Sequence, residues 1–153
     1  MSELEELFTK IRVDFLFSHP FLSVLALSLK HIWGENGNYP VLTDGRAIYL
    51  DGNKLSEYSP DEIKYLYAHV LLHVALKHPF RQKTKDPALW NGACDIATNL
   101  ILSKFSNIKC PNSCNITSSD KLNTSCAAFI STASMYYFSF IKVVYLFFCF
   151  TIE

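Results

Sequence analysis

The placement of glycine and proline divides this chain into two unlike parts. All five glycines and five of the six prolines lie within the first 106 residues, and only Pro111 follows. Turns between helices and strands depend on the backbone geometry of these two residue types. The remainder is rich in Ser, Thr, Phe and Tyr and holds four of the five cysteines. We therefore predict a folded domain over residues 1–106 and a low-complexity apolar tail over residues 107–153.

Charge and composition exclude several classes of protein. The 153 residues carry 14 basic and 14 acidic side chains, so the net charge is zero, and there is no basic excess with which to bind nucleic acid. An apolar fraction of 50% is too high for an intrinsically disordered chain. The N-terminus is acidic where a secretory signal would be basic, which favours a cytoplasmic protein.

The tail leaves alternatives open. Residues 127–152 are almost free of charge and are long enough to cross a bilayer as a helix, which would make the protein membrane-anchored. The same bias in composition is expected if the reading frame changes near residues 104–110 or if the C-terminus has decayed, which would leave a truncated protein. Its cysteines lack the spacing of a structural zinc site.

Short motifs predict the elements of the first part. A helix that is apolar almost all round, as a buried core helix would be, begins near Pro20, extends to Trp33 and ends at Gly34 to Asn38. Two apolar stretches flanking Asp44-Gly45 within residues 39–50 predict a β-hairpin, which Asp51-Gly52 closes.

Two further helices follow the hairpin. Ser59-Pro60-Asp61-Glu62 combines an N-cap, a proline in the first turn and a glutamate three residues after the cap. This helix should extend to about His78, before Pro79, and the next from Asp86-Pro87 to about Lys104. The order of elements predicts a small, mainly helical α+β domain.

Two histidines on the first of these helices carry the strongest chemical signal. His69 and His73 are four residues apart, so their imidazoles lie on one face, the spacing at which a helix offers two nitrogens to one zinc ion. In the usual motif a glutamate after the first histidine is the general base, but this chain has Val70. The alternative is an ordinary helix with one buried and one surface histidine.

The following helix offers a third ligand. Asn91, Asp95 and Asn99 form one polar stripe among apolar positions, and a carboxylate buried there needs a cation or several donors. A zinc ion held by the histidines would supply that cation. The alternative is that Asp95 caps a neighbouring helix or pairs with Arg81.

Other candidate residues have simpler interpretations. Cys94 should be a packed core thiol, and His78 should cap the last carbonyls of its helix, with a metal role as the alternative. His19 and His31 are interpreted as ordinary helix residues. A short basic stretch that contains Arg81, Lys83 and Lys85 should be a solvated turn.

Taken in order, these motifs resemble a known family. From Asp44 to Leu102 the chain is similar to the predicted metallopeptidase domain at the N-terminus of bacterial proteins whose C-terminal half is von Willebrand factor A-like. The matching motifs are Asp44-Gly45-Arg46, Ser59-Pro60-Asp61-Glu62, Ala68-His69 with Leu72-His73, His78, Arg81, Asp86, Leu89-Trp90-Asn91, Ala93-Cys94-Asp95 and Asn99.

The resemblance implies a zincin-like fold and a zinc-dependent peptidase activity on a peptide or protein substrate. It also implies His69 and His73 as zinc ligands with Asp95 as the third, and it places the family's catalytic glutamate at position 70, which is valine here. The leading hypothesis is therefore a metallopeptidase-like domain with weak or no activity. The alternatives are a non-catalytic metal-binding or regulatory module with the same fold, and a small protein tethered to a membrane through residues 127–152.

Overall fold

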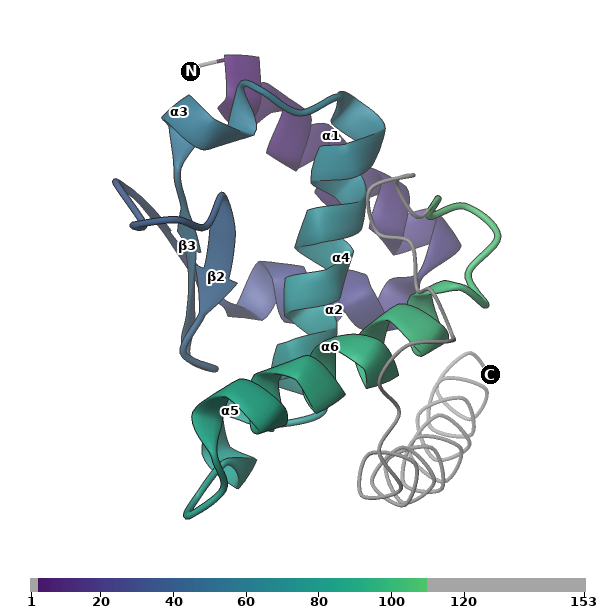
Figure 1. The fold of residues 1–153 in the computed structure, drawn as a ribbon. Coiled ribbons are helices and arrows are strands. Elements are labelled where there is room, and N and C mark those ends of the chain that lie inside the picture. The colour runs from purple at the N-terminus through teal and green to yellow at the C-terminus, as the bar shows by residue number, and fades with distance from the viewer. Residues whose placement is uncertain (1–2, 110–153) are drawn as a thin grey trace.

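A computed structural model describes residues 3–109 of the chain. Within this range two helices come first, three strands follow and four helices complete the order, and one long helix, α4, crosses the middle of the molecule (Figure 1). The elements are α1 (Glu3–Ser18), α2 (Pro20–Ser28), β1 (Lys30–Trp33), β2 (Val41–Thr43), β3 (Ala47–Leu50), α3 (Gly52–Leu55), α4 (Pro60–Ala75), α5 (His78–Arg81) and α6 (Pro87–Leu102). The predicted α+β class is confirmed, while the zincin-like assignment stays a prediction.

The strands form a three-stranded sheet in the order β1-β3-β2. Strands β2 and β3 pair antiparallel around Asp44-Gly45, which confirms the hairpin. The Asp44 carboxylate accepts hydrogen bonds from the backbone N–H groups of Arg46 and Ala47 at 2.8 and 2.9 Å, and Gly45 takes a φ of 87°. Asp51 closes the open end of the hairpin, because its backbone N–H donates to the Pro40 carbonyl at 3.0 Å. Its side chain also caps α3 by accepting from the N–H of Lys54.

The first apolar helix is shorter than predicted. It begins at Pro20 as expected but ends at Ser28, and Lys30–Trp33 form β1 instead of a last helical turn. This segment pairs parallel with β3, so hydrogen bonds to a distant strand outweigh the local helical pattern. The helix is not buried all round either, since Val24 and Leu27 are exposed.

Helix α1 was not among the predicted elements. It packs against α2 and contributes Phe8, Ile11 and Phe15 to the core. The interpretation of His19 and His31 as ordinary helix residues was wrong. His19 is the N-cap of α2 and stacks on Phe105 with ring centroids 4.6 Å apart, and His31 lies in β1 with its Nε2 2.7 Å from the Tyr67 hydroxyl.

Helix α4 is the central element of the fold. It contacts α1, α2, α5, α6 and β2. Tyr67 is fully buried and packs edge-to-face on Phe8 and parallel to Phe15, with centroids 5.0 and 6.0 Å apart. The core therefore holds α4 in place from one side, while another of its faces meets α6.

The helix boundaries follow the sequence signals at their starts more closely than at their ends. The capping box is present at Ser59, whose backbone N–H donates to the Glu62 carboxylate at 2.9 Å while its hydroxyl accepts from the Glu62 N–H. Helix α4 ends at Ala75, short of the predicted His78, because Lys77 adopts the left-handed conformation with φ 56°. Helix α6 begins as predicted, capped by Asp86, and ends at Leu102.

Among residues 3–109, no helix is both long and apolar enough to cross a membrane. The predictions for the tail, including the candidate anchor at 127–152 and the cysteines from Cys110 onward, fall outside the described residues.

The capping box should contribute measurably to the stability of the domain. Ser59→Ala leaves an N-terminal N–H of α4 without its acceptor, so we expect the free energy of unfolding in urea to fall by about 1 kcal/mol. Ser59→Asp is the matched control, since its carboxylate can accept the same hydrogen bond. Equal losses in both variants would show that the hydroxyl does not act as the cap.

Candidate metal centre

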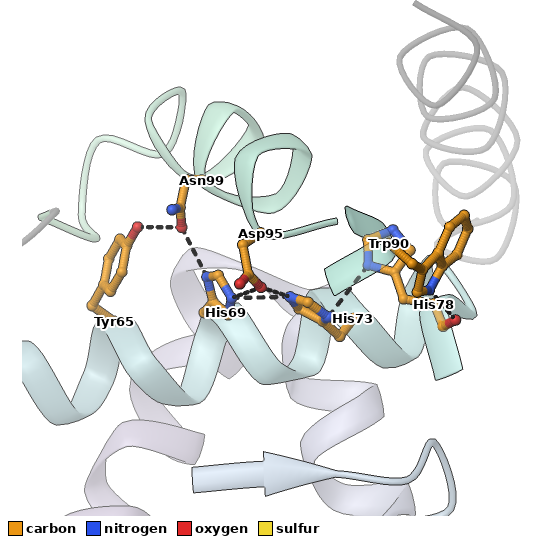
Figure 2. A network of polar contacts seen from close by, with 7 residues as sticks. All are labelled: Tyr65, His69, His73, His78, Trp90, Asp95 and Asn99. Atoms are coloured by element: carbon orange, nitrogen blue, oxygen red, sulfur yellow. Dashed lines mark hydrogen bonds and ion pairs between the residues drawn. The ribbon is translucent and has the colours of Figure 1, made fainter. Parts of the chain in front are cut away.

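Two imidazoles of α4 face each other at the centre of the site. His69 and His73 are one turn apart, and their Nε2 atoms lie 2.9 Å from each other (Figure 2). Both side chains are mostly buried, with exposed fractions of 18% and 17%. The helical spacing thus orients both rings in the way that the sequence predicted.

Asp95 of α6 completes a cluster of three. Its Oδ1 lies 3.4 Å from His69 Nε2 and 3.2 Å from His73 Nε2. The alternative of an ion pair with Arg81 is wrong, because Arg81 instead donates to the Leu76 carbonyl at 3.3 Å. The structure therefore brings the three predicted ligands together, although their binding of a metal stays a prediction.

The three donor atoms have the chemistry and the spacing of a metal site. Two imidazole nitrogens and a carboxylate oxygen form a common zinc ligand set, with bonds of about 2.0–2.2 Å in tetrahedral geometry. That geometry separates neighbouring donors by roughly 3.3 Å, compared with 2.9, 3.2 and 3.4 Å here. In the described part of the chain, this is the group of His, Cys, Asp and Glu residues that meets the requirement of three convergent ligands.

The far nitrogens of the two histidines contact further polar side chains. His69 Nδ1 lies 2.8 Å from Asn99 Oδ1, which also accepts a hydrogen bond of 2.7 Å from the Tyr65 hydroxyl. His73 Nδ1 lies 3.3 Å from His78 Nδ1. The cluster is thus the middle of a longer row of polar groups (Figure 2).

The prediction that His78 caps the end of α4 was wrong. The helix ends before it, and the left-handed Lys77 reverses the chain so that His78 opens α5. Its side chain is buried, with 4% of the residue exposed, and its carbonyl accepts from the Trp90 indole at 3.1 Å. A spacing of five residues gave no signal of a contact with His73, because five residues place two side chains on different faces of a continuous helix.

The basic stretch before α6 is more than a solvated turn. Lys85 Nζ lies 4.4 Å from the centroid of the Trp90 ring, and the Arg81 guanidinium lies 6.0 Å from it. Both distances are within the range of cation–π interactions. The loop therefore packs against the Trp90 indole, which also donates a hydrogen bond to the His78 carbonyl. Lys83, like Lys77, is a non-glycine residue with a positive φ, here 47°.

A cleft of about 320 Å³ opens over the cluster. It is lined by residues of β2, α4, α5 and α6, among them Thr43, Val70 and Asn91 as well as the three clustered residues. Val70 is 8% exposed. The side chain that follows the first histidine is thus part of the wall of this cleft.

The electrostatics of the cluster favour an ionised Asp95 carboxylate and a neutral His73 imidazole. Burial opposes the charge on Asp95, but hydrogen bonds from His69 and His73, together with their charges, lower the pKa of its carboxyl well below the usual range. Burial is the main cause that lowers the pKa of His73, against the opposing effect of Asp95. Neutral imidazole and ionised carboxylate are the forms that bind metals.

Cys94 does not belong to the cluster. It is 2% exposed, and burial together with the Asp95 charge raises the pKa of its thiol to about 12. A thiol that stays protonated is a poor metal ligand, so the prediction of a packed core residue is confirmed.

These features define a class: a small helical domain with an accessible His/His/Asp cluster that could bind a metal ion. The chain belongs to the family described as "Putative metallopeptidase domain", whose model matches residues 8–129. No curated protein and no solved structure shows significant similarity to the chain. The match extends past residue 106, so the predicted domain boundary there stays a prediction. The relation to proteins with a von Willebrand factor A-like C-terminal half also stays a prediction.

The buried His78 should make the metal-free protein sensitive to acid. Burial, with the charges of His73 and Arg81, lowers its pKa from 6.5 to about 3. Below pH 6.5 the unfolded chain takes up a proton that the folded chain does not, so the free energy of unfolding should fall between pH 6.5 and 3, by at most about 1.4 kcal/mol per pH unit from this group.

Urea unfolding of the full chain in a chelator, at a series of pH values, measures this dependence. His78→Asn does not titrate and should make it shallower, with the remainder due to His19, His31, His73 and the carboxylates. An unchanged slope in this variant would contradict the assignment.

Proposed function

We propose that the protein is a zinc-binding member of its family, in which His69, His73 and Asp95 hold the ion and peptidase activity is weak or absent. The observation that supports it best is the convergence of three donor atoms, 2.9 to 3.4 Å apart, from two helices. Asp95 supplies one negative charge, and the two imidazoles can bind through neutral nitrogens. This donor set matches the preference of zinc for nitrogen and oxygen ligands in sites that retain an open position.

A peptide would reach the ion through the cleft between β2 and the helices. Zinc in such a site supplies Lewis acidity toward a peptide carbonyl and lowers the pKa of a bound water. The chain itself must then supply a group that takes a proton. Asp95 carries the only carboxylate among the described residues that line the cleft, and it is already committed to the two histidines.

Position 70 is where the missing base would act. Val70 lies in the cleft wall beside the ligands, and an isopropyl group accepts no proton. Loss of a general base typically reduces a rate by about 100- to 10,000-fold. The ligands are separate from the base, so metal binding should persist without it.

A second candidate function rests on the same valine. With no base at position 70, the cluster would serve a non-catalytic metal-binding or regulatory module that binds a peptide or protein partner. A membrane tether through residues 127–152 would be compatible with either function.

Zinc binding by the full chain should depend on each of the three residues. We expect one zinc per chain in the unmutated protein and loss of stoichiometric zinc in His69→Ala and Asp95→Asn. Zinc at about 100 times its Kd should raise the free energy of unfolding by about 2.7 kcal/mol. His31→Gln, at a histidine outside the cluster, is the control, and an unmutated protein without stoichiometric zinc would refute the proposal.

Restoring a carboxylate at position 70 separates the two functions. Val70→Glu should raise hydrolysis of a fluorogenic peptide library about 100- to 10,000-fold above the unmutated chain, and removal of zinc should abolish the gain. Val70→Gln has the same size without the base and should stay inactive. If the zinc-loaded glutamate variant is also inactive, the non-catalytic module is the better description.

A further inference from the structure

We propose that Asn99 and His78 are positioning residues, which hold His69 and His73 so that each presents its Nε2 to the metal. The inference rests on the proposed function, because it concerns the same three ligands. It adds two residues that contact Nδ1 of the histidines and leave Nε2 for the ion. Asn99 contacts Nδ1 of His69, and His78 contacts Nδ1 of His73 (Figure 2). A histidine ligand generally needs such a partner to fix its tautomer and its ring orientation.

The partner of His69 is the side-chain oxygen of Asn99. This oxygen accepts from the Tyr65 hydroxyl at 2.7 Å and lies 2.8 Å from His69 Nδ1. A carbonyl oxygen has two lone pairs and no proton to give, so His69 must donate from Nδ1. When a metal ion takes the place of the contact between His69 Nε2 and Asp95, a neutral imidazole with its proton on Nδ1 offers the lone pair of Nε2 to the ion.

The partner of His73 is the ring of His78. Their Nδ1 atoms are 3.3 Å apart. One of these nitrogens therefore carries a proton and donates the hydrogen bond, and the other accepts the hydrogen bond. If His73 binds the metal through Nε2, the proton lies on its Nδ1 and His78 accepts. His78 is then neutral with its own proton on Nε2, a form that its burial favours.

Each positioning residue is itself held by an aromatic side chain on the opposite helix. Tyr65 of α4 donates to Asn99 of α6, and Trp90 of α6 donates to the backbone carbonyl of His78, which follows α4. At one end of the row α4 is the donor and α6 the acceptor, and at the other end α6 is the donor and His78 of α5 the acceptor. They restrict both partners before any metal binds, which is the preorganisation that a precise ligand geometry requires.

The experiment measures zinc affinity and proton signals in the full chain. Zinc Kd values are obtained by competition with a chromophoric chelator for Asn99→Leu and His78→Leu, which remove the acceptors. We expect each to bind zinc about 10- to 100-fold more weakly. Asn99→Asp and His78→Asn keep an acceptor near the same place and should stay within a few-fold of the unmutated protein.

Imidazole NMR distinguishes positioning from a general structural effect. In the zinc-loaded protein, the ¹H–¹⁵N spectrum should show His69 and His73 protonated at Nδ1. The acceptor-free variant at position 99 should shift the His69 signal alone, and that at position 78 the His73 signal alone. Asn91→Leu, two turns earlier on α6 and also in the cleft wall, should change neither signal, and Tyr65→Phe tests the Asn99 side without altering Asn99 itself.

The outcomes separate this inference from the function on which it rests. If the unmutated chain binds no zinc, the proposed function fails and the inference fails with it. If the chain binds zinc and the leucine variants, folded by circular dichroism, bind it equally well, only the inference is overturned. It is overturned as well if the two histidine signals shift together in every variant, because a general loosening of the helices would then explain the weaker binding.

Discussion

The contact between α4 and α6 is the interaction on which the site depends, and it includes a row of polar groups. Tyr65, His69 and His73 of α4 meet Asn99 and Asp95 of α6 across the interface, and His73 continues the row to His78 of α5 (Figure 2). Buried polar atoms are costly unless each finds a partner. Tyr65 is buried and the two histidines are mostly buried, so they meet that requirement only while the two helices keep their register. The core packing of α4 around Tyr67 therefore also sets the positions of the candidate ligands.

Much of this arrangement could be predicted from local sequence. The capping box at Ser59, the Asp44-Gly45 turn and the Asp86-Pro87 start act through neighbouring backbone atoms, and such signals are visible within a few residues. The spacing of His69 and His73 is equally local. Asp95 could be identified because a carboxylate in an apolar helix lacks any local partner, which indicates a distant one.

Features set by distant contacts could not be predicted in this way. Strand β1 has a helical pattern and becomes a strand through pairing with β3. His78 would lie about 140° around a continuous helix from His73, and only the reversal at Lys77 brings the two rings together. Nothing in the residue types at 76 and 77 marks that reversal, since glycine, the usual residue there, is absent.

The hairpin turn has a role beyond joining two strands. A Cβ atom built on Gly45 would lie 2.5 Å from the Phe80 ring, so the turn is seated against the same short helix, α5, that carries His78. The turn between β2 and β3 therefore supports α5, which carries His78 at one end of the polar row. A change in the turn at positions 44–46 would therefore shift α5 and the His78 side of the candidate site, although none of those residues lines the cleft.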